Sequence, residues 1–187
     1  MKSSLRNMVM VLLLITLIAS AAVGVVYQLT VDPIQAAKEA KIVNAVKEVL
    51  PPFESLNKEV KAIPVEGDTV RIYTAESGKD VVGYAVETFS KNGFGGMIRI
   101  MVGFLPDGTI NSTSVISHSE TPGLGDKMEK SKSSFALQFE GKNPETFKLG
   151  VKKDGTGDVD AITASTISSR AFVDAVKRGY EKVMENK

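Results

Sequence analysis

The most apolar stretch of the chain lies near its start, where residues 8–27 carry no charge and only Thr16 and Ser20 are polar. Twenty helical residues, at a rise of about 1.5 Å each, cover roughly 30 Å, the thickness of the hydrocarbon core of a bilayer. Lys2 and Arg6 precede the stretch, and basic residues beside a span tend to stay in the cytoplasm. We therefore expect a cytoplasmic N-terminus (1–7), a transmembrane helix (8–27) and an extracytoplasmic domain (28–187).

A cleaved signal peptide is the alternative for this stretch. Ala19, Ser20 and Ala21 resemble the small residues of a cleavage site. The apolar region of a cleaved signal usually runs for only about 7 to 15 residues, whereas this one continues through Val25 and Val26. Its length favours retention as an anchor, and either alternative exports the rest of the chain.

Two later stretches have apolar residues at helical spacing. The first opens at Asp32-Pro33, runs to about Leu50 and is ended by Pro51-Pro52. The second runs from Ser168 to Met184, with Ser168 or Ser169 as the expected N-cap. These patterns predict one helix at each end of the exported domain.

The region between these helices changes to alternating or short apolar runs, which predict strands. The runs are 70–73, 81–89, 97–104 and 109–117. Turn signals, ESG at 76–78 and PDG at 106–108, separate neighbouring runs and indicate hairpins. We expect an α+β domain with an antiparallel or mixed sheet flanked by helices.

Composition excludes several kinds of chemistry. The 23 basic and 22 acidic residues nearly balance, so there is no basic footprint for nucleic acid. No cysteine and a single histidine, His118, leave thiolate metal sites, iron–sulfur clusters and cysteine nucleophiles without ligands or donors. The aspartates at 154, 158 and 160 lack the spacing of a calcium loop. We expect no metal site, and redox chemistry would need an organic cofactor.

Two segments are candidates for binding such a cofactor. Residues 117–126, SHSETPGLGD, follow a predicted strand, and their glycines allow the backbone to approach a flat ligand closely. Residues 160–169, DAITASTISS, precede the C-terminal helix, where unpaired N–H groups and the helix dipole favour an anion such as phosphate. An ordinary polar turn and a serine-rich cap without a ligand are the plain alternatives.

Together these segments resemble a known family, the FMN-binding subunits of the Rnf-type ion-translocating electron-transport complex and of the Na⁺-translocating NADH:quinone reductase. The family motif D-x-x-[ST]-[GA]-[AS]-[ST]-x-[ST] is matched in order by Asp160, Thr163, Ala164, Ser165, Thr166 and Ser168. Its ETPGLG loop stands at 120–125, and GFGGMI at 93–98 resembles its glycine-rich strand opening. The resemblance covers nearly the whole chain. The equivalent subunit of the quinone reductase tends to be longer than this chain, so its length favours the G subunit of the Rnf-type complex.

The resemblance implies that the phosphate of FMN is joined by an ester to the hydroxyl of Thr166, and that a flavin transferase makes the bond. It also implies that the loop lies along the flavin ring. The cofactor-binding residues expected on this basis are Thr163, Ala164, Ser165, Thr166, Glu120, Thr121, Pro122, Gly123, Leu124 and Gly125. The chain departs from the family's common residues at Ala164, Ser165 and Met97, where glycine, alanine and proline are frequent. His118, just before the loop, is expected to be a structural or surface residue rather than a redox partner.

In such a family the subunit carries electrons between membrane partners of an ion-translocating complex in the inner membrane. The chain itself would neither bind NADH nor transport ions. Two other functions remain open at this point: a membrane-anchored flavoprotein that donates electrons to an extracellular acceptor, and a noncatalytic membrane-anchored binding module without flavin. The presence of flavin and the identity of copurifying subunits distinguish the three.

Overall fold

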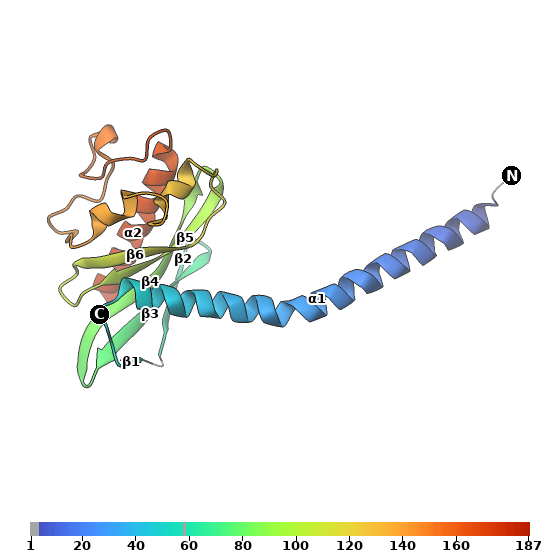
Figure 1. Ribbon diagram of the computed structural model, residues 1–187, viewed down its shortest axis with the longest axis horizontal. Coiled ribbons are helices and arrows are strands. Elements are labelled where there is room, and N and C mark those ends of the chain that lie inside the picture. The colour runs from blue at the N-terminus through green and yellow to red at the C-terminus, as the bar shows by residue number, and fades with distance from the viewer. Residues whose placement is uncertain (1–3, 58) are drawn as a thin grey trace. The chain divides into compact units, whose positions relative to one another are not determined.

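The computed structural model describes residues 4–57 and 59–187, and these form an α+β chain of two compact units, Met1–Lys41 and Ile42–Lys187. Residues 1–3 of the predicted cytoplasmic N-terminus, with Lys2, lie outside the described part. Helix α1 (Leu5–Val49) forms the first unit and continues into the second. The second unit contains a sheet and helix α2 (Thr166–Asn186) (Figure 1).

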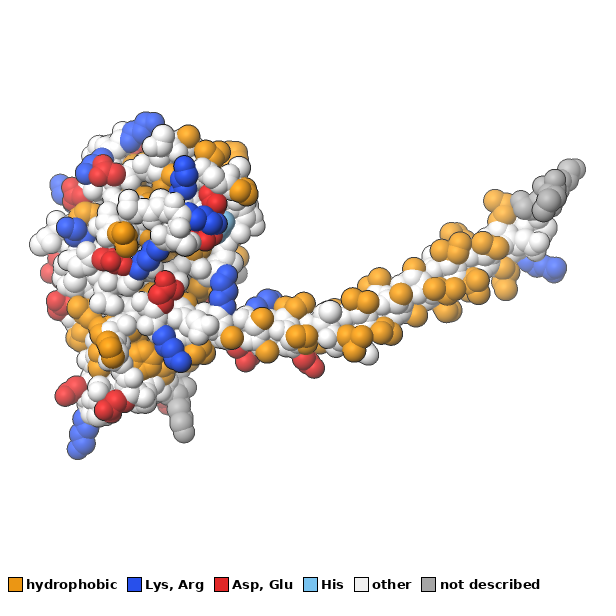
Figure 2. All heavy atoms as spheres, viewed as in Figure 1, with side chains coloured by type: hydrophobic (Ala, Val, Ile, Leu, Met, Phe, Trp, Pro, Cys, Tyr) orange, Lys and Arg blue, Asp and Glu red, His pale blue; other side chains and the backbone are white. Residues whose placement is uncertain are grey.

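Helix α1 contains the whole of the expected span 8–27. Its side chains from Met8 to Ile15 are all exposed although all are apolar, so no single face of the helix is polar there (Figure 2). A helix that is apolar all round is suited to lipid, and α1 is long and apolar enough to cross a membrane. The separate helix expected to open at Asp32-Pro33 is wrong, because α1 runs unbroken through Pro33. Proline removes only one donor from the helical ladder, and the turns on both sides continue it.

The sheet is antiparallel throughout, with strand order β1-β3-β4-β5-β6 and with β2 paired to the same edge of β3 as β1. Its strands are β1 (Ser55–Leu56), β2 (Lys61–Val65), β3 (Asp68–Ser77), β4 (Asp80–Gly93), β5 (Gly96–Phe104) and β6 (Ile110–Ser117). The four predicted runs are confirmed as β3 to β6, and both turn signals connect paired strands. Strands β1 and β2 had no predicted counterpart.

Two apolar clusters lie on opposite faces of the sheet. The larger packs α2 and the irregular segment after β6 against β3 to β6, with Phe104, Phe139 and Phe172 fully buried in it. The smaller places Val46 and Val49, from the end of α1, against Ala85 and its neighbours. The sheet is therefore covered on both sides.

The segment between β6 and α2 contains only short 3₁₀ helices, η1 (Gly125–Met128), η2 (Phe135–Phe139) and η3 (Lys152–Asp154). Buried side chains hold it in place, among them Met128 and Phe135. Both candidate cofactor segments lie in it or at its end, so the larger core positions them together.

Candidate functional site

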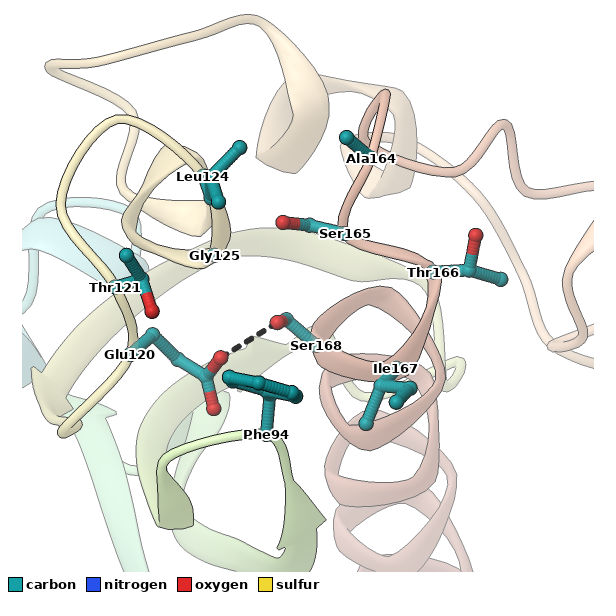
Figure 3. A pocket seen from close by; sticks show the side chains of 10 residues that line it. All are labelled: Phe94, Glu120, Thr121, Leu124, Gly125, Ala164, Ser165, Thr166, Ile167 and Ser168. Carbon is teal, nitrogen blue, oxygen red and sulfur yellow. Dashed lines mark hydrogen bonds between the residues drawn. The ribbon is translucent and has the colours of Figure 1, made fainter.

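A cavity of about 340 Å³ opens where three segments meet: the turn between β4 and β5, the loop after β6, and the first turn of α2 (Figure 3). Its volume falls at the lower end of the range typical of small-molecule sites, roughly 300–1,000 Å³. The cavity is lined by Phe94, Glu120, Thr121, Leu124, Gly125, Ala164, Ser165, Thr166, Ile167 and Ser168. These segments are far apart in sequence, and the fold brings them to one place.

Most residues expected from the sequence line this cavity, but three do not. Pro122 and Gly123 are exposed and are absent from the lining. Thr163 is exposed and faces a second, polar cavity that it shares with Gln138 and Asp160. The ends of the loop and the first turn of α2 therefore form the wall, and the middle of the loop points away.

Sequence reasoning missed three lining residues: Phe94, Ile167 and Ser168. Phe94 is 71% exposed in the turn between β4 and β5, which is unusual for a side chain of that size. The GFGGMI segment was the available signal, because a phenylalanine among glycines in a tight turn has no neighbours in the core to pack against.

The start of α2 differs from the expected cap. The helix begins at Thr166 with Ser165 at the N-cap position, and Ser165 makes no side-chain cap hydrogen bond. Ser168 and Ser169 are buried inside the first turn. The Ser169 hydroxyl donates to the Ser165 carbonyl at 2.9 Å and accepts from the backbone N–H of Ile162 at 2.9 Å. These two bonds fix the preceding turn against the helix, which is why the helix starts earlier than predicted.

The turn before α2 places Ala164 in a left-handed backbone conformation, with φ at 62°. The Ser165 N–H closes this turn by donating to the Ile162 carbonyl at 3.0 Å. Left-handed backbone favours glycine, since an L side chain crowds the following carbonyl there. A glycine at this position would adopt the turn without that crowding, whereas this chain adopts it with alanine.

The first N–H groups of α2 are open to an anion. Ser169 is the first helical residue to bond back, to the Ser165 carbonyl at 3.0 Å. The three preceding residues, Thr166 to Ser168, are in the first turn, whose N–H groups have no partner within a helix. With the helix dipole they favour a phosphate beside the Thr166 hydroxyl.

His118 holds the start of the loop. Its Nδ1 accepts the backbone N–H of Glu120 at 3.1 Å, so the ring proton is on Nε2, which donates to the Glu129 carboxylate at 2.8 Å. That hydrogen bond from His118 holds the pKa of Glu129 below its usual value, and Lys132 acts in the same direction. His118 is absent from the cavity lining and orients the loop that forms it.

A family model, the FMN-binding domain, matches residues 93–181, a span that includes every lining residue of the cavity. The chain is also 32% identical over 197 residues to the G subunit of the ion-translocating oxidoreductase complex of Vibrio atlanticus, covering 100% of this chain and 93% of the relative. The chain belongs to this family of G subunits.

Other members of the family agree over most of the chain. The protein of Vibrio cholerae strain M66-2 is 30% identical over 198 residues, covering 100% of this chain and 93% of its own. The G subunit of the proton-translocating ferredoxin:NAD(+) oxidoreductase complex of Clostridium ljungdahlii is 35% identical over 166 residues, covering 89% of this chain and 84% of its own. This chain is thus a subunit of an ion-translocating oxidoreductase complex and contains an FMN-binding domain.

Proposed function

We propose that this subunit carries FMN joined by a phosphoester to the hydroxyl of Thr166, and that it transfers electrons between other membrane subunits of its complex. The observation that supports this most strongly is the position of Thr166. It is the first residue of α2 and lines the cavity inside the FMN-binding domain. A phosphate on its hydroxyl would lie beside open N–H groups of the helix.

The other hydroxyl groups nearby fit an attachment point less well. Ser165 and Ser168 line the cavity but are buried, and Ser168 is already bonded to Glu120. Thr121 lies on the loop after β6 and not on the helix, and Thr163 faces the second cavity. Thr166 alone among these combines partial exposure, the cavity and the helix start.

The lining also suits the flat ring of a flavin. Phe94, Leu124 and Ile167 present exposed apolar surface to the cavity from its three segments. Thr121 and the backbone around Gly125 supply polar groups that could orient a ring edge. FMN, when bound, supplies reversible electron uptake, and these residues would hold it, exclude water from one face and keep it near the protein surface.

The remaining assignments follow from the anchor. α1 would cross the inner membrane once, with residues 28–187 on the extracytoplasmic or periplasmic side, because Lys2 and Arg6 favour a cytoplasmic N-terminus. Outside the cytoplasm a lost cofactor is not readily replaced, so a covalent bond keeps the subunit loaded. A flavin transferase would provide the activation that a threonine hydroxyl needs. The transferase would be able to bind the segment 160–166, because Thr163 and Ala164 are exposed.

The test is to produce the full chain with a flavin transferase and measure intact mass and flavin fluorescence in a denaturing gel. The parent should carry one FMN, Thr166→Ala none, and Thr166→Ser a reduced amount. Thr163→Ala is the matched control, since it removes the neighbouring exposed hydroxyl of the same motif and should keep the adduct. An adduct that survives in Thr166→Ala, or is lost only in Thr163→Ala, would contradict the assignment.

A further inference from the structure

Glu120 is a buried carboxylate in the wall of the cavity, 5% exposed, without a basic partner. Within residues 4–57 and 59–187 it forms no ion pair. The other strongly buried glutamate, Glu87, is held by Arg71 and Arg99, each at 3.1 Å. Burying a carboxylate without a counter-charge costs free energy of folding, so the burial of Glu120 points to a role other than stability.

The carboxylate joins all three segments of the cavity. Its Oε1 accepts the backbone N–H of Gly95 at 3.0 Å, in the turn between β4 and β5. Its Oε2 accepts the hydroxyl of Ser168 at 2.6 Å, in the first turn of α2 (Figure 3). Glu120 itself belongs to the loop after β6. Each oxygen of the carboxylate is thus held by a different neighbouring segment.

Glycines make room for this group. A Cβ at Gly93 would come within 2.5 Å of Oε1, and one at Gly125 within 2.5 Å of Oε2. Real Cβ atoms do not approach an oxygen so closely, so a larger residue at Gly125 would displace the carboxylate. A larger residue at Gly93 would crowd both the carboxylate and the carbonyl oxygen of Gly96, which would lie 2.3 Å from the added Cβ. Two glycines from the family-like segments 93–98 and 120–125 therefore serve to admit Glu120 beside the cavity.

We propose that Glu120 is a positioning residue that fixes these three segments around the flavin and, through its negative charge, lowers the midpoint potential of the flavin beside it. This inference rests on the proposed function, because it needs FMN in the cavity. A fixed negative charge in a poorly solvated site opposes the arrival of an electron. Its two hydrogen bonds come from neutral donors, so they offset part of the cost of burial and leave the negative charge in place to act on the flavin ring.

The experiment compares midpoint potentials by spectroelectrochemistry in the full chain, produced with a flavin transferase and held in detergent. Glu120→Gln keeps the size of the side chain and removes its charge, and its potential should rise. The rise should correspond to about tenfold or more in the reduction equilibrium, about 59 mV for one electron. Ser168→Ala removes a donor and keeps the charge, so its potential should fall or stay the same. Glu140→Gln removes a charge from a residue outside the cavity and should change nothing.

The opposite directions separate charge from packing. An unchanged potential in Glu120→Gln would overturn the proposal, because removal of the carboxylate would then have no effect on the flavin. A rise of similar size in Ser168→Ala would also overturn it, because loosening of the cavity would explain both variants. If Glu120→Gln shows no cooperative transition in thermal unfolding, it does not fold. In that case a raised potential in Ser168→Ala would by itself overturn the proposal. A parent chain without any FMN adduct contradicts the proposed function first, and this inference with it.

Discussion

At the scale of single residues, the segment that leads into α2 is held by side chains rather than by regular secondary structure. The amide of Gln138 bonds twice to the backbone of Asp160, accepting from its N–H at 2.8 Å and donating to its carbonyl at 3.1 Å. Ser169 holds the next turn through Ile162 and Ser165. The position of Thr166 is thus set from both sides.

Ala164 has the most strained backbone in this segment, because its φ of 62° is in the left-handed region. That conformation costs an L residue roughly 1–2 kcal/mol in the folded state. Replacement of alanine by glycine also lowers the free energy of unfolding by about 0.4–1 kcal/mol, because glycine gives the unfolded chain more conformational freedom. Ala164→Gly should therefore raise the free energy of unfolding by about 0.5–1 kcal/mol. Denaturant unfolding of the purified chain measures it.

The matched control for this prediction is Ala62→Gly. Ala62 is exposed in strand β2 and, unlike Ala164, has no positive φ. Glycine in a strand should lower stability there by about 0.5–1 kcal/mol. Equal losses in both variants would show that the turn at Ala164 imposes no strain.

Most of the residues expected from the motif and the loop, Thr166 among them, line the cavity, because spacing along the chain identifies a segment. The motif could not separate Thr163 from Thr166 by direction, since the two face different cavities only after the turn at Ala164 forms. It also missed Ser168, whose hydroxyl was interpreted as a cap. Its actual partner, Glu120, lies 48 residues away, and no local pattern indicates such a contact.

At the scale of elements, one close approach fixes the end of α1 on the sheet. A Cβ added at Gly103, in β5, would lie 1.9 Å from the carbonyl oxygen of Val49. Gly103 therefore allows the backbone of the helix to reach the strand directly, with Val46 and Val49 packed beside it. The smaller apolar cluster depends on this contact.

Gly103→Ala should separate the helix end from the strand and lower the free energy of unfolding by about 1–3 kcal/mol, as for other overpacked cores. Gly24→Ala is the control, because a Cβ at Gly24 has no atom within 4 Å and should not destabilise the chain. Denaturant unfolding of both variants in detergent distinguishes them. A Gly103→Ala chain as stable as the parent would mean that the helix end can move without loss.

The central strands were predictable because their apolar residues alternate over a useful length. β1 has two residues, and β2 contains Pro64 and is mostly exposed, so neither shows that signal. Their pairing with β3 at the sheet edge comes from tertiary contact instead. The same holds for α1, where Pro33 suggested a boundary that the neighbouring turns override.

At the scale of the whole molecule, the chain combines an apolar helix with a domain built to hold a cofactor. The helix has exposed hydrocarbon side chains over residues 8–15, and the domain has its core between sheet and α2. An anchor and a covalent cofactor would serve the same purpose in an electron carrier. Each replaces a binding equilibrium with a high local concentration of a partner.

The absence of native cysteine allows a direct test of membrane orientation with a single introduced thiol. Ser131 is exposed in the domain, and Ser4 lies just before α1. In cells with a permeabilised outer membrane, an impermeant maleimide should label Ser131→Cys and should label Ser4→Cys only after lysis, since positive charge keeps the N-terminus inside. The reverse pattern would place the domain in the cytoplasm. Labelled Ser4→Cys of full-length mass after lysis would also show that the apolar segment is retained, whereas cleavage near Ala19 to Ala21 would remove the labelled residue from the mature chain.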